Sequence, residues 1–242
     1  MLKILRIFIL ISSFSQVLPV TRLSGQEKEG MVKYTPDFRF TDGIYLNFDQ
    51  VKMNSPIPKS KILTSIDYND REFFNKILEG DKIYFYDNMG IRQEVAKNSI
   101  WGYSRNGVLY VQVQDNFNRI TFVGNICHFV ADITTVDRSY NSPYGYYDPY
   151  YYPYSYSNYY NPYYSPYRSN MTRNELKQYL IDFESGKVLE FDVDNTELLL
   201  MKDDKLYEEY VQLSRKKKKD LMFVYIRKFN ENNPLFIPVP AQ

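Results

Sequence analysis

The sequence has very little of the chemistry that most enzyme and metal sites require. Its 242 residues include one cysteine (Cys127), one histidine (His128) and one tryptophan (Trp101). One cysteine excludes an internal disulfide, and one histidine excludes a histidine metal cluster. Because Cys127 and His128 lie in an apolar, strand-like run, we interpret both as buried structural residues, and Trp101 as a core or rim aromatic. We therefore expect neither a cofactor nor a metal.

Sequence motifs for other chemistry are also missing. The sequence contains no glycine-rich phosphate loop, no paired-cysteine zinc motif and no nucleophile elbow. Segment 192–195 (Asp-Val-Asp-Asn) resembles the start of a calcium loop but lacks the glycine and the distal glutamate that such a loop needs. Basic and acidic residues nearly balance, 30 against 29, which argues against a nucleic acid partner. We predict that the protein is not an enzyme, although carboxylate pairs that converge only in space stay open.

Residues 1–26 have the pattern of an export signal. Lys3 and Arg6 precede a short apolar run, which leads to the small residues Ser24 and Gly25. The run is too short and too interrupted for a spanning helix, which needs about 20 apolar residues. No cysteine follows it, so we do not expect a lipoprotein. The sequence predicts an exported protein that is periplasmic or associated with the outer envelope.

The exported part reads as an α+β protein. We expect a flexible segment over residues 27–40, followed by a β-rich domain over residues 41–192. Short alternating strands recur about every ten residues, and Asn106-Gly107 is a strong signal for a tight hairpin. This pattern predicts a small antiparallel β-meander curled into an SH3-like, partly open barrel.

A tyrosine-rich and proline-rich insertion interrupts this domain. Between residues 140 and 167, 14 residues are tyrosine and five are proline, and no aliphatic side chain is present to seed a core. We expect a disordered loop over residues 140–170 that offers flat aromatic faces to sugar rings, peptides or other tyrosine-rich chains; a tolerated low-complexity insertion is the alternative. The candidate interaction residues are Tyr146, Tyr147, Tyr150, Tyr151, Tyr152, Tyr159, Tyr160, Tyr163 and Tyr164.

Residues 193–234 are expected to be helical, and residues 235–242 to be a tail. The last helix has an apolar stripe at Met222, Tyr225, Ile226 and Phe229. A basic run precedes the stripe and opposes the helix dipole. That conflict suggests an anionic partner such as lipid phosphate or the cell wall, with a solvated face as the alternative. The basic candidates are Arg215, Lys216, Lys217, Lys218 and Lys219.

Several stretches resemble an uncharacterised exported protein family of Bacteroidetes-type bacteria. They are segments 42–46 and 99–103, Arg119-Ile120 with Gly124 and segment 128–130, and the tail segment 225–230 with Asn233-Pro234. The resemblance implies export into a two-membrane envelope. It transfers no activity and no functional residue.

These observations lead to one main functional hypothesis and two alternatives. We hypothesise a non-enzymatic envelope protein, a binding or assembly module that displays the tyrosine-rich loop to an envelope glycan or another envelope protein. One alternative is a periplasmic hydrolase that acts on envelope glycan or peptide through carboxylates. The other is an accessory subunit whose terminal helices dock on an envelope complex. Peripheral membrane contact is compatible with the basic run.

Overall fold

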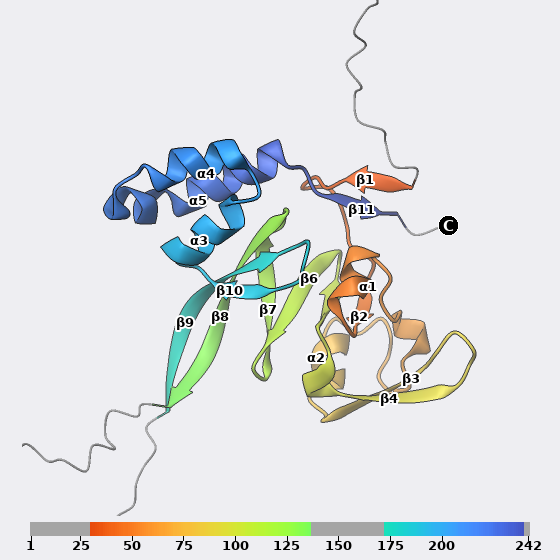
Figure 1. The fold of residues 1–242 in the computed structure, drawn as a ribbon. Helices are drawn as coiled ribbons and strands as arrows, with labels where there is room; N and C mark the ends of the chain where they lie inside the picture. Colours follow the sequence, from red (N-terminus) through yellow and green to blue (C-terminus); the bar gives the residue numbers. More distant parts are fainter. Residues whose placement is uncertain (1–29, 137–171, 240–242) are drawn as a thin grey trace, which may run out of the picture.

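The computed structural model describes residues 30–136 and 172–239 and shows an α+β fold with antiparallel sheets (Figure 1). The largest sheet contains β2 (Gly43–Tyr45), β5 (Gly102–Arg105), β6 (Val108–Val113), β7 (Asn116–Phe122), β8 (Ile126–Val136), β9 (Thr172–Asp182) and β10 (Val188–Glu190). Its spatial order is β10-β9-β8-β7-β6-β5-β2. From β5 to β10 every neighbour in space is the neighbour in sequence, as expected for a meander. The two end strands, β10 and β2, are not paired with each other in the described part of the chain.

Turn chemistry sets the register of this meander. Asn106 and Gly107 connect β5 to β6 with positive φ angles of 54° and 74°, which confirms the predicted tight turn. The carboxylate of Asp42, distant in sequence, accepts hydrogen bonds from the N–H groups of Asn106 (3.0 Å) and Gly107 (2.9 Å). The turn is therefore fixed by local residues and by a long-range anchor.

The hairpin after residue 80 does not join the large sheet. β3 (Lys82–Tyr86) and β4 (Arg92–Ala96) form a sheet of their own, whereas the meander prediction placed them beside the next strands. A 3₁₀ turn over Lys97–Ser99 redirects the chain after β4, and β2 pairs with β5 instead. The hairpin packs with helix α2 (Phe73–Ile77) over the β2–β5 end of the large sheet.

Both ends of the described chain belong to the fold, which corrects two predictions. Residues 31–33 form strand β1 (Met31–Lys33), which pairs with β11 (Phe236–Pro238). Phe40, Leu235 and Ile237 are buried in the core. The flexible segment expected over residues 27–40 and the tail expected over residues 235–242 therefore contain paired strands and core residues.

The C-terminal helices are α3 (Val193–Leu200), α4 (Asp204–Val211) and α5 (Arg215–Asn232). Asp192 and Asp203 cap α3 and α4 by accepting backbone N–H groups with their side chains. The predicted stripe of α5, Met222, Tyr225, Ile226 and Phe229, is buried. The short helix α1 (Phe48–Lys52) is capped by Asn47 and is not evident from the sequence, because residues 44, 46 and 48 are apolar in alternation, as in a strand.

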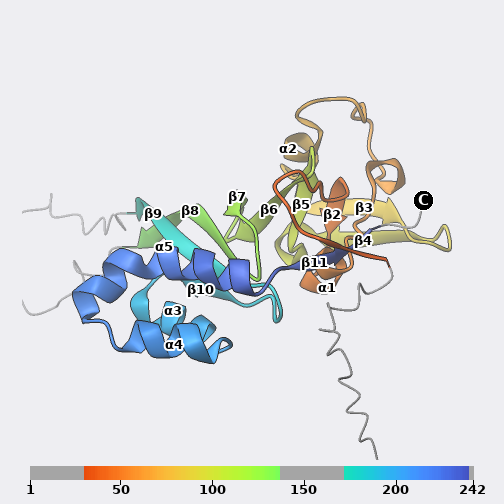
Figure 2. The same cartoon turned by 90° about the horizontal axis from the view of Figure 1, so that it is seen from above.

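Three cores pack on the large sheet. The first core occupies one face and includes Cys127 and Phe129 of β8. The second core lies on the opposite face at the β2–β5 end, under α2 and the β3–β4 hairpin. The third core lies under α3, α4 and α5 and includes Ile126 and Leu180. Seen from above in Figure 2, the helices and the β3–β4 hairpin occupy opposite ends of the molecule.

Candidate functional site

The nine candidate tyrosines between Tyr146 and Tyr164 lie outside the described residues. The structure does define the two strands, β8 and β9, that precede and follow their segment. β8 and β9 pair over eleven positions, from Ile126 opposite Asp182 to Val136 opposite Thr172. The chain therefore leaves the sheet at residue 136 and returns at residue 172, on two directly adjacent strands.

The basic candidates Arg215–Lys219 form the start of α5. Ser214 is the N-cap residue but makes no side-chain capping bond. Lys218 is half-buried, because its Nζ donates to Glu197 (3.1 Å) and its carbonyl accepts the Tyr210 hydroxyl (3.0 Å). The other four cations are exposed. One of the five predicted contact residues therefore serves the packing of α5 on α3 and α4.

The exposed cations also fall into different surroundings. Arg215, Lys216 and Lys219 border a concave surface of about 760 Å³, together with Phe191, Asp192, Val193, Asp194 and Met222. Asp192 is already engaged as the cap of α3, since its carboxylate accepts the Asn195 N–H at 2.7 Å. The surface thus combines cations with carboxylates, and the sequence run does not form one uniform cationic patch.

His128 and Cys127 are both buried, as predicted. The Nε2 of His128 lies 2.9 Å from the Gln178 Oε1, and the ring is buried between Phe191 and Phe223. Cys127 is buried in the first core, and burial raises the pKa of its thiol to about 12. A neutral, inaccessible thiol is a poor nucleophile and a poor metal ligand.

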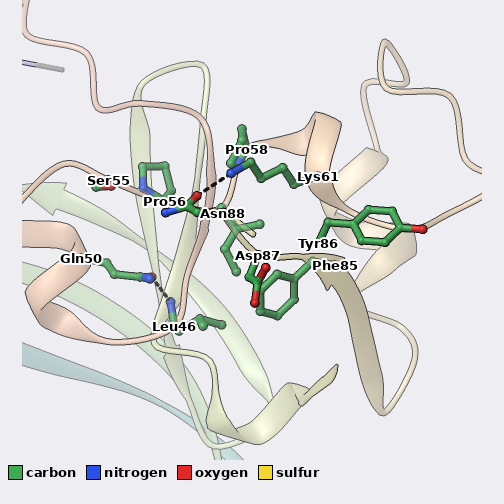
Figure 3. A pocket seen from close by; sticks show the side chains of 11 residues that line it. Leu46, Gln50, Ser55, Pro56, Pro58, Lys61, Phe85, Tyr86, Asp87 and Asn88 are labelled. Carbon is green, nitrogen blue, oxygen red and sulfur yellow. Dashed lines mark hydrogen bonds between the residues drawn. The ribbon is translucent and has the colours of Figure 1, made fainter. Parts of the chain in front are cut away.

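A second concave surface lies between α1 and the β3–β4 hairpin (Figure 3). It has a volume of about 190 Å³, enough for one small ring or side chain. Its lining residues are Leu46, Gln50, Ser55, Pro56, Ile57, Pro58, Lys61, Phe85, Tyr86, Asp87 and Asn88. Sequence reasoning missed this groove because its walls come from three separate segments, none of which has a motif.

Two polar groups of this groove have fixed positions. The Lys61 Nζ donates to the Asn88 Oδ1 at 2.6 Å (Figure 3). Asp87 accepts the N–H groups of Met89 (2.8 Å) and Ile91 (2.9 Å) and the Gln93 amide (3.0 Å). The bond from Ile91, followed by that from Gln93, lowers the pKa of Asp87. Asp87 is therefore an ionised turn-forming residue.

In a third concave surface, of about 570 Å³, two carboxylates converge on one lysine. The Lys202 Nζ lies 2.7 Å from both Asp182 Oδ1 and Glu184 Oε2. Burial raises the pKa of Asp182, but hydrogen bonds from Lys202 and Ser185 outweigh it, so the pKa lies below its usual value. A general acid needs the opposite shift, so this pair reads as an ion pair.

Residues 30–136 and 172–239 contain no group of three or more His, Cys, Asp or Glu side chains placed to hold a metal ion. Within the same ranges, no helix is both long and apolar enough to cross a membrane. Comparison of the chain with protein-family models, with curated proteins and with solved structures found no match.

Proposed function

We propose that this protein is an exported, non-enzymatic module of the cell envelope that binds or assembles through its tyrosine-rich segment. The observation that carries the proposal is the pairing of β8 with β9 as far as residues 136 and 172. A long insertion between two adjacent antiparallel strands does not interrupt the strand pairing of the sheet. The segment is then an attachment to a complete sheet, which is the arrangement expected of a display loop.

Composition supports the choice of ligand. Tyrosine offers an apolar ring face and a hydroxyl group at a low cost in conformational entropy. With 14 tyrosines between residues 140 and 167, the segment suits repeated weak contacts with sugar rings or with other aromatic chains. The export pattern of residues 1–26 and the resemblance to exported proteins support an envelope location. We also propose that the large sheet is curved into an SH3-like, partly open barrel.

The register of β8 and β9 permits a clean test of the segment. Replacing residues 137–171 with Asn-Gly joins paired residues 136 and 172 by a two-residue hairpin turn. A matched control keeps the full length and changes the 14 tyrosines to serine. Each protein is cosedimented with isolated cell wall and with outer-membrane vesicles.

The proposal expects the wild type to bind one of these materials and both variants to lose that binding while keeping the wild-type thermal unfolding. Binding that survives in both variants overturns it. Loss in the hairpin variant alone assigns the effect to the length of the segment and overturns the role of tyrosine.

An accessory subunit is the second candidate, and the exposure of the basic run favours it. Lys216, Lys217 and Lys219 are exposed, whereas Lys218 is engaged by Glu197. Changing the three exposed lysines to glutamate and leaving Lys218 intact reverses the surface charge without breaking the internal pair. This candidate expects the variant to lose copurification with its envelope complex. Unchanged copurification rules the basic run out as the contact.

A further inference from the structure

The third concave surface is built where distant parts of the chain meet. Helix α1, the turn before β8, the turn after β9, the connection from α3 to α4, the end of α5 and strand β11 all contribute lining residues. Its volume of about 570 Å³ falls within the usual range of small-ligand sites, about 300 to 1,000 Å³. Because the lining comes from so many segments, the sequence contains no motif for it.

Hydrogen bonds hold the walls of this surface together. The Asn125 Nδ2 donates to the Asn233 carbonyl at 2.8 Å, and the Asn233 Nδ2 donates to the Phe229 carbonyl at 3.1 Å. On the opposite side, the Lys52 Nζ donates to the Glu184 carbonyl at 3.3 Å. The walls are therefore fixed before a ligand arrives, so binding would lose little free energy to their ordering.

The charges that line this surface are paired within the protein. The Lys202 Nζ lies 2.7 Å from a carboxylate oxygen of Asp182 and 2.7 Å from one of Glu184. The other lining cation, Lys52, lies 3.1 Å from Asp49. An ionic ligand would have to compete with these pairs, whereas a neutral ligand leaves them intact. The lining therefore favours a neutral ligand.

Two amide oxygens and one aromatic ring remain open to such a ligand. Asn125 and Asn233 are half-buried, and both use their Nδ2 atoms in bonds within the protein. Within residues 30–136 and 172–239, no donor bonds to the Oδ1 atom of either side chain. Phe236, in the same lining, is 46% exposed. The surface thus combines hydrogen-bond acceptors with an exposed apolar ring.

A sugar ring has C–H groups on its flat faces and hydroxyl donors around its edge, so it matches a surface of this kind. We infer that the third concave surface binds a neutral oligosaccharide, with one sugar ring stacked on Phe236 and hydroxyl groups donating to the Oδ1 atoms of Asn125 and Asn233. This site goes beyond the proposed function, because it uses no residue of the tyrosine-rich segment.

Titration with defined trisaccharides, followed by saturation-transfer NMR, tests the inference. The neutral probes are maltotriose, cellotriose, mannotriose and chitotriose. Trigalacturonate is the anionic comparator, triglucosamine the cationic comparator and capped trialanine the peptide comparator. Phe236→Ala removes the ring, and Phe236→Tyr keeps it. Val32→Ala is the matched control, since Val32 is also 46% exposed and belongs to β1, the strand that pairs with β11.

The inference expects at least one neutral trisaccharide to bind with a dissociation constant of about 5 mM or lower. Phe236→Ala should weaken this binding about fivefold or more, and Phe236→Tyr and Val32→Ala less than about twofold, all with wild-type thermal unfolding. No binding of a neutral trisaccharide, or equal binding by Phe236→Ala and the wild type, overturns the inference.

Two further outcomes assign the binding elsewhere. Tighter binding of a charged trisaccharide or of capped trialanine overturns the assignment to a neutral sugar. Sugar binding that persists in Phe236→Ala but is lost when the 14 tyrosines are changed to serine belongs to the tyrosine-rich segment, and it overturns the inference for this surface.

Discussion

One side chain fastens α5 to the large sheet. The Asn230 Nδ2 donates to the Ile126 carbonyl, and the Asn230 Oδ1 accepts the Ile126 N–H, both at 2.8 Å. The asparagine amide thus pairs with the first residue of β8 as a neighbouring strand would. Gly124 leaves room for it, because a Cβ there would lie 2.4 Å from the Asn230 Nδ2. We predict that this contact is a main stabilising link between the helices and the sheet.

Replacing Asn230 with alanine would leave both backbone groups of Ile126 without their partner. Each unpaired buried group costs about 1 to 3 kcal/mol, so complete burial would imply about 2 to 6 kcal/mol. Because Asn230 itself is half-buried, water can reach part of the site and replace some of the lost bonding. We therefore expect Asn230→Ala to lower the free energy of unfolding by about 2 to 3 kcal/mol.

Urea unfolding followed by the fluorescence of Trp101, the only tryptophan, measures this loss. Asn232→Ala is the control, since Asn232 is an exposed residue of the same turn with one bond to Asp203 at 3.2 Å. The control should cost less than about 1 kcal/mol. Gly124→Ala should destabilise like Asn230→Ala, and the two losses together should be less than additive because they break the same contact. An Asn230→Ala loss no larger than that of the control would refute this account.

Three further predictions follow from individual contacts. Asp42→Ala should lower the free energy of unfolding by about 1.5 to 3 kcal/mol in urea unfolding, since the charged acceptor of the turn 106–107 is lost; a loss below about 0.5 kcal/mol would contradict it. The pKa of Asp182 is lowered in the folded protein, so its ion pair with Lys202 stabilises above the ordinary carboxyl pKa and is lost as the pH falls through the folded pKa. Thermal unfolding measured from pH 7 down to about pH 3 should therefore show that acidification lowers the stability of Lys202→Met less than that of the wild type. Cys127 should react with a thiol reagent only on unfolding, so fast labelling of the native protein would contradict its burial.

The features predicted correctly from the sequence depend on short-range chemistry. Asn-Gly at 106–107 forms the expected turn because both residues tolerate positive φ, whatever the rest of the chain does. The stripe of α5 is buried as expected because four apolar residues recur at helical spacing over eight positions. In both cases a few neighbouring residues are enough to determine the local structure.

The features that were missed depend on partners distant in sequence. β1 and β11 have three residues each and pair across almost the whole chain. A three-residue strand is too short to show a clear alternation, so neither its presence nor its partner can be predicted from the sequence. Residues 44, 46 and 48 are apolar in alternation, as in a strand, yet Asn47 caps a helix that begins at Phe48. The different surroundings of the five basic residues could have been predicted from the sequence. Consecutive residues of a helix are rotated by 100°, so neighbouring lysines lie on different sides of α5.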